Sequence, residues 1–233
     1  MRLAVLIKAP GNTRGVSIRL VRIGDNDYPR QLLNSPSPPK SLYIRGLPIP
    51  GSRIISIAGS RKASKQALAI AREVGTTLAR MGYTIVTGLA PGVDEEATRG
   101  VMMAGGHVIG VLPWLDYYRA YILRDYPRAT LVSEFPSQPN GVNPRGLFVV
   151  RDRVIAWLGE ALVVIEARPD SGTIHTFNFA RLGGRRVFVL RPVVVERGVY
   201  MAFRYMTENG ATPFSDPGEL VGLLASMGLS RQS

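Results

Sequence analysis

The chain has 233 residues, with 29 Lys and Arg against 17 Asp and Glu, which gives a formal net charge of +12. It contains no cysteine and only two histidines, so disulfides, thiolate metal sites, a cysteine nucleophile and a histidine-built metal centre are all excluded. No apolar run approaches the roughly 20 residues that cross a bilayer, and Leu3 to Ile7 is too short for a signal peptide. We therefore expect a soluble, cytoplasmic protein without metal or cofactor.

The basic excess is carried mainly by arginine, because Lys8, Lys40, Lys62 and Lys65 are the only lysines. A guanidinium binds phosphate in a fork and stacks on bases better than an ammonium does, so this excess favours a nucleic-acid partner. An arginine-rich composition also accompanies thermophily or GC-rich coding. The charge alone leaves both explanations open.

Residues 1–51 differ in character from the rest of the chain. Prolines recur from Pro29 to Pro48 and keep this region out of long helices. We interpret residues 1–51 as an N-terminal extension that packs on the main domain, with one short strand near Leu42 to Arg45. Residues 52–233 then form the main domain and a short C-terminal tail.

From residue 53 onward, the hydrophobic pattern alternates between strand and helix. This alternation predicts an α/β fold of three layers, in which a mostly parallel sheet is covered on both faces. The expected strands are 54–57, 83–87, 107–112, 131–135, 161–166 and 187–190, and the expected helices are 67–81, 95–104, 148–158 and 173–180. In the tail we expect one or two short helices around Ala211 to Phe214.

The first candidate site is the turn Gly59-Ser60-Arg61, followed by Lys62, directly after the strand 54–57. Glycine permits backbone angles that are closed to other residues, while Ser60 and Arg61 supply a hydroxyl and a fixed positive charge. The turn opens a helix, whose N-terminal amides and dipole favour anions. A phosphate would fit such a turn, although no GxGxxG or Walker lysine motif is present. A tight connection with a solvated Arg61 is the other interpretation.

Two further small-residue turns follow predicted strands. One holds Gly88 and Gly92 before Asp94, and the other is Ser171-Gly172-Thr173. Turns at the carboxyl ends of parallel strands converge on the crevice where open α/β sheets bind ligands. Between them, residues 114–128 hold four tyrosines, one tryptophan and three arginines, which either stack on bases or pack beneath a loop.

Several short motifs occur in the order seen in the DNA-processing protein A (DprA/Smf) family, and the chain resembles that family from about Tyr28 to Gly210-Ala211. The motifs are Tyr28-Pro29, Pro38-Pro39, Leu42-Tyr43, Gly59-Ser60-Arg61, Thr87-Gly88-Leu89-Ala90-x-Gly92-Val93-Asp94, Ser133-Glu134, Arg151-x-Arg153-Val-Ile155, Glu166-Ala167 and Ser171-Gly172-Thr173. Two positions depart from the family's pattern: its Arg-Asn-Arg element is Arg151-Asp152-Arg153 here, and its histidine after Gly-Val-Asp is absent.

The resemblance implies an extended Rossmann-like domain that binds single-stranded DNA, often as a homodimer, and hands it to a RecA-type recombinase. By matching position, it places Gly59, Ser60 and Arg61 in a phosphate-binding groove with Arg151, Arg153 and the turn from Ser171 to Thr173. Arg151 and Arg153 have a second interpretation, which is structural pairing with Asp152 or Glu166.

Enzymatic interpretations have less support from the residues. Ser171 lacks a nucleophile-elbow pattern, and His175 is expected to be a packed histidine rather than a base. Asp94, Glu95 and Glu96 at a helix start complement its dipole more simply than they bind a metal. We therefore expect no catalytic residue.

Two small-ligand alternatives remain. The segment Pro169 to Thr173 looks like a distant version of the turn in lysine-decarboxylase-like phosphoribohydrolases, which cleave the N-glycosidic bond of nucleoside monophosphates. The position of their catalytic glutamate is held here by His175, Thr176 and Phe177. The second alternative is that the site binds a nucleotide as a sensor ligand.

Overall fold

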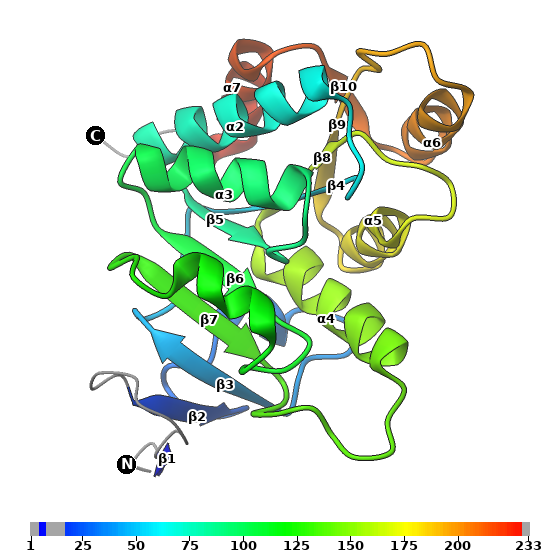
Figure 1. Cartoon of the computed structure of the whole chain (residues 1–233). Helices are drawn as coiled ribbons and strands as arrows, with labels where there is room; N and C mark the ends of the chain where they lie inside the picture. The colour runs from blue at the N-terminus through cyan, green and yellow to red at the C-terminus, as the bar shows by residue number, and fades with distance from the viewer. Residues whose placement is uncertain (1–4, 8–16, 230–233) are drawn as a thin grey trace.

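The computed structural model describes residues 5–7 and 17–229, in which helices pack on both faces of one sheet (Figure 1). The strands are β1 Val5–Ile7, β2 Ile18–Arg22, β3 Ser41–Gly46, β4 Ile54–Gly59, β5 Thr84–Thr87, β6 Val108–Val111, β7 Ala129–Ser133, β8 Ala161–Ile165, β9 Arg186–Leu190 and β10 Thr212–Phe214. The helices are α1 Arg30–Leu33, α2 Lys65–Arg80, α3 Val93–Met103, the 3-10 helix η1 Tyr118–Leu123, α4 Pro144–Leu158, α5 Gly172–Leu182, α6 Arg197–Glu208, α7 Pro217–Leu224 and η2 Ala225–Leu229.

The strands lie in the order β1-β2-β3-β7-β6-β5-β4-β8-β9-β10. The seven strands from β7 to β10 are parallel, whereas β1, β2 and β3 extend the sheet at one edge by antiparallel pairing. The chain therefore has the predicted Rossmann-like α/β fold with a mostly parallel sheet.

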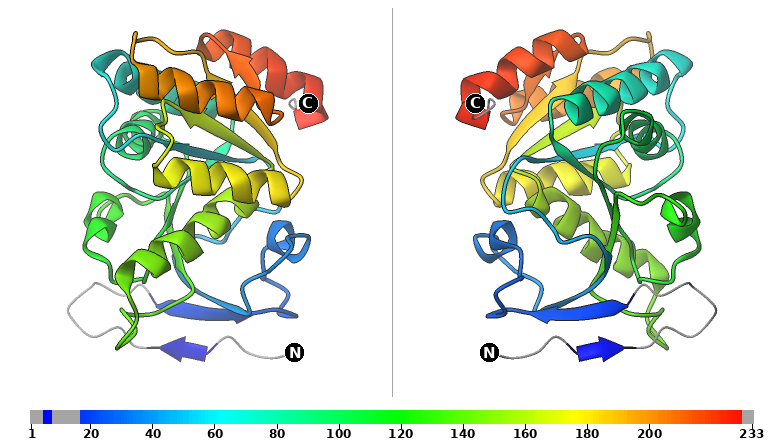
Figure 2. Two further views of the ribbon diagram at one scale, coloured as in Figure 1. Left: turned by 90° about the vertical axis from the view of Figure 1, so that its right-hand side faces the viewer. Right: turned by 90° about the vertical axis from the view of Figure 1, so that its left-hand side faces the viewer.

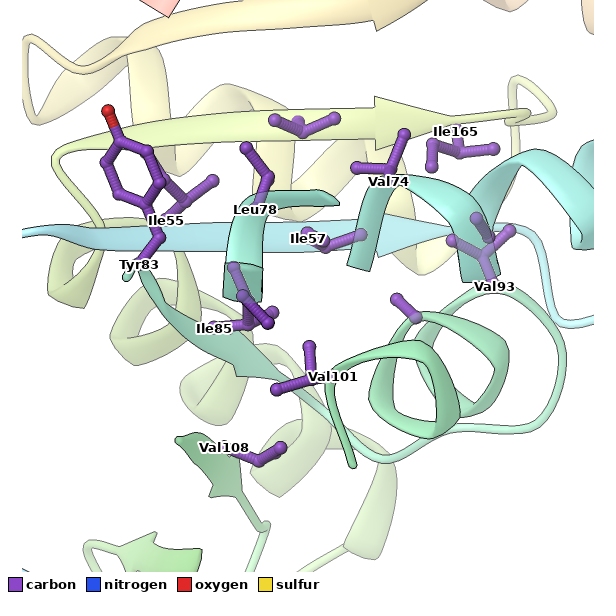
Figure 3. Packing of buried hydrophobic residues seen from close by; sticks show 14 of the residues in the cluster. Ile55, Ile57, Val74, Leu78, Tyr83, Ile85, Val93, Val101, Val108 and Ile165 are labelled. Carbon is purple, nitrogen blue, oxygen red and sulfur yellow. The ribbon is translucent and has the colours of Figure 1, made fainter. Parts of the chain in front are cut away.

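Each central strand carries apolar side chains on both faces because each face of the sheet is covered. On β4, Ile55 and Ile57 belong to one buried cluster while Ile54 and Ala58 belong to the other. Figure 3 shows Ile55 and Ile57 facing Val74 and Leu78 of α2. This two-sided burial explains why β4 and β8 are near-continuous hydrophobic runs rather than alternating ones.

The helices divide into two layers. Side chains of α2, α3 and α7 contribute to the first cluster, and those of α4, α5 and α6 contribute to the second. The two views of Figure 2 show these layers on opposite sides of the sheet. In the described ranges, no helix combines the length and apolar character that a membrane span requires.

Residues 17–51 continue the sheet of the main domain. The predicted strand near Leu42 is β3, which pairs with β7, and Tyr28 and Leu32 are buried in the second cluster. The prolines limit helix to the four residues of α1. Residues 1–4 and 8–16 of the predicted extension lie outside the described residues, and the boundary at residue 51 stays a prediction.

Two predicted elements are wrong in extent or type. The helix predicted from Phe148 begins at Pro144, because Asn143 caps it and Pro144 occupies its first turn. The short helices predicted around Ala211 to Phe214 are present as α6 and α7 on either side, but Thr212 to Phe214 themselves form β10, which pairs in parallel with β9. Three residues are too few to show a strand pattern, so pairing with β9 decides this conformation.

We predict that Phe214→Ala destabilises the domain by about 3–5 kcal/mol, because Phe214 is fully buried in the first cluster. Thr212→Ala, at an exposed position of the same strand, should change stability by less than about 0.5 kcal/mol. Urea denaturation followed by circular dichroism measures both changes. Equal effects of the two substitutions would contradict the placement of β10 in the core.

Candidate functional site

The strand order reverses between β4 and β8, which are parallel neighbours at the centre of the sheet. After β4 the chain crosses to the face covered by α2, and after β8 it crosses to the face covered by α5. The two connections therefore separate and leave a crevice at the carboxyl ends of these strands. All three predicted turns lie at this edge, after β4, β5 and β8.

Gly59 is required where β4 meets β8. A Cβ at residue 59 would overlap the carbonyl oxygen of Ile165 and lie 2.7 Å from the side chain of Val93. The next amide, of Ser60, donates to the carbonyl of Glu166 at 2.7 Å. The glycine thus permits close packing of the two strand ends, which fixes the position of the turn.

The Ser60 hydroxyl is engaged inside the protein. Ser60 is buried, and its Oγ accepts from the Lys62 amide at 3.2 Å and from Arg168 Nη1 at 2.8 Å. Arg168 also forms an ion pair with Glu196 at 2.7 Å. The sequence alone does not identify Arg168 as a site residue, because its partners Ser60 and Glu196 are distant in the chain.

A carboxylate of the protein itself lies at the N-cap of α2. Glu166 accepts from the Ser64 amide at 3.1 Å and from the Ser64 hydroxyl at 2.7 Å. Helix α2 begins only at Lys65, so the turn from Gly59 to Arg61 precedes the helix without belonging to its first turn. The anion-favouring end of α2 is therefore already partly neutralised by Glu166.

Arg61 and Lys62 are exposed at the mouth of the crevice, and Arg61 makes no hydrogen bond or ion pair within residues 5–7 and 17–229. The Arg61 guanidinium lies 5.6 Å from the ring centroid of Phe148, which is on α4. Arg151, one turn further along α4, lies 5.6 Å from the same ring. Two cations thus flank one aromatic ring.

Arg151 is buried and lies against the Gly88 turn. A Cβ at residue 88 would overlap the Arg151 guanidinium, so only glycine leaves room for it. Beneath it, Asp94 accepts from the amides of Gly88 at 3.0 Å and Ala90 at 3.4 Å. Burial raises the pKa of the Asp94 carboxyl, and Arg151 opposes that shift.

Asp152 is another buried acid of the crevice, besides Asp94 and Glu166. Its Oδ1 lies 3.6 Å from Arg151 Nε, and its Oδ2 would lie 3.5 Å from a Cβ added at Gly172. Burial raises the pKa of Asp152 to about 6, Arg151 acts against this shift, and the charge of Asp94 adds to it. Arg151 is therefore shared between Asp94 and Asp152. Of the two structural partners predicted from the sequence, Asp152 and Glu166, it is Asp152 that lies beside Arg151.

The Ser171-Gly172-Thr173 turn opens α5 at the same edge. The Ser171 hydroxyl donates to the Arg168 carbonyl at 2.7 Å and does not cap the helix, and Gly172 is exposed. The first amides of a helix have no partner within it, so those of Gly172 and Thr173 are donors available at the crevice. His175 was predicted to be packed, but it is exposed on the first turn of α5.

Two predicted residues have different surroundings. Gly92 adopts φ 84°, and a Cβ there would overlap the Ser60 carbonyl, so its role is to hold the β5 and β4 turns together. Arg153 donates to Glu134 at 2.6 and 2.8 Å, and that pair lies away from Arg151 on α4. Arg153 thus forms a structural ion pair, as one interpretation predicted, but its partner is Glu134 rather than Asp152 or Glu166.

Among the described residues, no group of three His, Asp or Glu side chains is placed to hold a metal ion. The arrangement instead offers exposed cations, free helix amides and an aromatic ring. These groups suit a ligand that carries both phosphate and flat rings.

The family model of DNA recombination-mediator protein A matches residues 19–225, which is most of the chain. The chain belongs to this family. A protein named Smf from Synechocystis is 35% identical over 182 residues, a match that covers 71% of this chain and 44% of the relative. The chain spans about half the length of the curated relatives it matches.

Solved structures of family members share the fold. The X-ray structure of DNA processing protein A from Streptococcus pneumoniae has a TM-score of 0.77 at 27% identity, with 90% of this chain and 75% of that chain covered. DNA processing protein A from Helicobacter pylori, studied for its single-stranded DNA binding mode, has a TM-score of 0.73 at 21% identity, with coverages of 86% and 94%. The second likeness concerns the fold alone.

We predict that Asp152→Asn stabilises the domain at pH 7, on the order of 2 kcal/mol, because it removes a buried charge whose pKa is raised to about 6. Between about pH 4 and pH 6 the folded protein keeps a proton on Asp152 that the unfolded chain has lost. The contribution of Asp152 to wild-type stability should therefore fall as pH rises through this window.

Urea denaturation of both proteins at intervals from pH 4 to pH 7 measures this effect. The variant should lose less stability across the window than the wild type, although Asp94 contributes in the same direction in both. Identical pH profiles would contradict the raised pKa of Asp152.

Proposed function

We propose that this domain binds single-stranded DNA at the crevice and does so without catalysis. The observation that carries the proposal is the pair formed by Arg61 and Phe148, in which an unpaired cation and a half-buried ring meet at the mouth of the crevice. The Arg61 guanidinium can neutralise a phosphate, and the Phe148 ring can stack on a base. Membership of a DNA-processing family supports nucleic acid over other anionic ligands.

The phosphate contacts divide between two kinds of donor. The amides of Gly172 and Thr173 position phosphates, while Arg61 and Lys62 attract them over a longer range. Arg151 is less available, since Asp94 and Asp152 share its charge. Arg153 contributes least to this proposal because Glu134 already pairs with it.

The three buried carboxylates of the crevice are each engaged by groups of the protein, and Asp152 lies 3.6 Å from Arg151 Nε. Glu166 is held by Ser64, and Asp94 by two backbone amides, so neither carboxylate is free to take a proton from a substrate. His175 is exposed, and within residues 5–7 and 17–229 its ring makes no hydrogen bond to a serine or threonine hydroxyl; its charge instead lowers the pKa of Asp152. Hydrolysis of a nucleoside monophosphate therefore remains the alternative rather than the conclusion.

We extend the proposal to the role expected of the family, in which the bound strand is passed to a RecA-type recombinase by a homodimer. The family's description as a recombination mediator supports this step. Sedimentation of the protein with and without an oligonucleotide tests the dimer. Recombinase-driven strand exchange with and without the protein tests the hand-over.

We predict that Arg61→Ala weakens binding of a thymidine oligonucleotide and lowers the salt slope by about 0.7, the value for one phosphate contact on a single strand. Phe148→Ala should weaken the same complex by about 1–3 kcal/mol with an unchanged salt slope. Fluorescence anisotropy across a salt series measures both effects.

Arg186→Ala serves as the matched control, because Arg186 is exposed at the amino end of β9, far along the strand from the crevice. It should leave affinity nearly unchanged. Equal losses for Arg61→Ala and Arg186→Ala would show that binding follows net charge and would overturn the proposed site. Turnover of a nucleoside monophosphate that disappears in Asp94→Asn or Glu166→Gln would instead support the hydrolase.

A further inference from the structure

A second concave surface lies outside the crevice, between η1 and the strands β3 and β7. It encloses about 820 Å³, within the range of pockets that hold small organic groups. We call it the tyrosine hollow, and its principal residues are Arg45, Asp116, Tyr117, Tyr118, Tyr121 and Arg124. Nothing in the phosphate site described above uses these residues.

The aromatic rings of the tyrosine hollow are poorly covered by the protein itself. Tyr118 is 65% exposed and Tyr121 is 52% exposed, although both are large and partly apolar. The ring centroids of Tyr117 and Tyr118 lie 4.6 Å apart, with the ring planes tilted by 58°. Exposed aromatics gathered around a concavity indicate a site for a flat, partly apolar ligand group.

The charges of the tyrosine hollow are balanced. Arg45 and Arg124 face two acids, Asp116 and Asp125, and none of the four side chains forms a salt bridge within the described ranges. Burial and the nearby Arg124 lower the pKa of Arg45, while Asp116 opposes this shift. A phosphate would be repelled by the acids as much as it is attracted by the arginines, so a neutral ligand with both donors and acceptors fits better.

The tyrosine hollow is connected to the crevice by aromatic contacts. Tyr117 lies 5.6 Å from Phe148 in an edge-to-face arrangement, and Phe148 is the ring beside Arg61. Trp114 lies 4.9 Å from Tyr117 and extends the same row. A strand held at Arg61 and Phe148 can therefore continue along this row into the tyrosine hollow.

We propose that the tyrosine hollow takes one unstacked base of the bound single strand, with guanine preferred. This inference rests on the proposed function. Guanine presents O6 and N7 to a guanidinium as two acceptors, and its N1–H and N2–H groups to a carboxylate as two donors. No other base has both an edge with two acceptors and an edge with two donors. Each of the others can therefore form a two-point contact with an arginine or with an aspartate at most, and not with both.

The test uses oligothymidylates of about 10 nucleotides in which a single guanine is moved through the sequence, measured by fluorescence anisotropy at one salt concentration. We expect one position at which guanine tightens binding by about 5- to 100-fold, the discrimination typical of a two-point base contact. Asp116→Asn and Arg124→Ala should each remove this preference and leave affinity for the all-thymine strand unchanged. Both residues are exposed, so the variants should fold.

Glu73→Gln and Arg186→Ala, at exposed positions on α2 and β9, are the matched controls and should retain the guanine preference. A wild-type protein that binds the all-thymine strand but shows no preferred guanine position would overturn this inference and leave the proposed function intact. A preference that persists in Asp116→Asn and Arg124→Ala would also overturn it. Failure to bind any single strand would overturn the proposed function itself.

Discussion

The close approach of β4 to β8 is the constraint on which the rest of the site depends. Gly59 is in contact with the Ile165 carbonyl, and the Ser60 amide bonds to the Glu166 carbonyl. After these strands the chain crosses to opposite faces of the sheet. The turns that follow β4 and β8 therefore lie side by side at the carboxyl edge of the sheet, where the crevice is. The turn at Gly92 packs against the carbonyls of Ser60 and Arg61, so a side chain at either glycine would displace groups of the crevice.

The electrostatics of the crevice divide the arginines into two kinds. Arg151, Arg153 and Arg168 each lie beside acids of the protein, where they offset the cost of burying those acids. Arg61 is exposed and forms no ion pair within the described residues, although its charge lowers the pKa of Asp94 and Asp152. Net charge therefore overstates the number of cations available to a ligand, and the position of the uncommitted ones matters more than their sum.

The strands and turns of the crevice could be predicted from the sequence because their signals are local. Continuous runs such as Ile54 to Ala58 indicate buried strands, and glycines directly after them indicate turns. Family resemblance then selected Arg151. The sequence does not show that Asp94 lies beneath Arg151, since that contact depends on how α3 and α4 meet across the edge of the sheet.

The remaining errors have equally physical causes. The start of α4 depends on the Asn143 cap within a loop-like composition, and β10 depends on pairing with β9. The family resemblance predicts both Arg151 and Arg153 in the groove by matching position, but residues two apart on a helix do not share a face, and Arg153 pairs with Glu134. The sequence predicts only that Phe148 belongs to a helix. Its contact with Arg61 joins residues far apart in the chain, so the residues adjacent to Phe148 give no sign of it.

The aromatic row gives the site a property that its cations lack. Phosphates run along single and double strands alike, so Arg61 and the amides of α5 cannot by themselves distinguish the two. Phe148 and the tyrosines can stack only on bases whose faces are exposed, which requires an unpaired strand. Under the proposed function, the cations and amides supply affinity, and the aromatic row from Phe148 to Tyr118 accounts for a preference for single-stranded DNA.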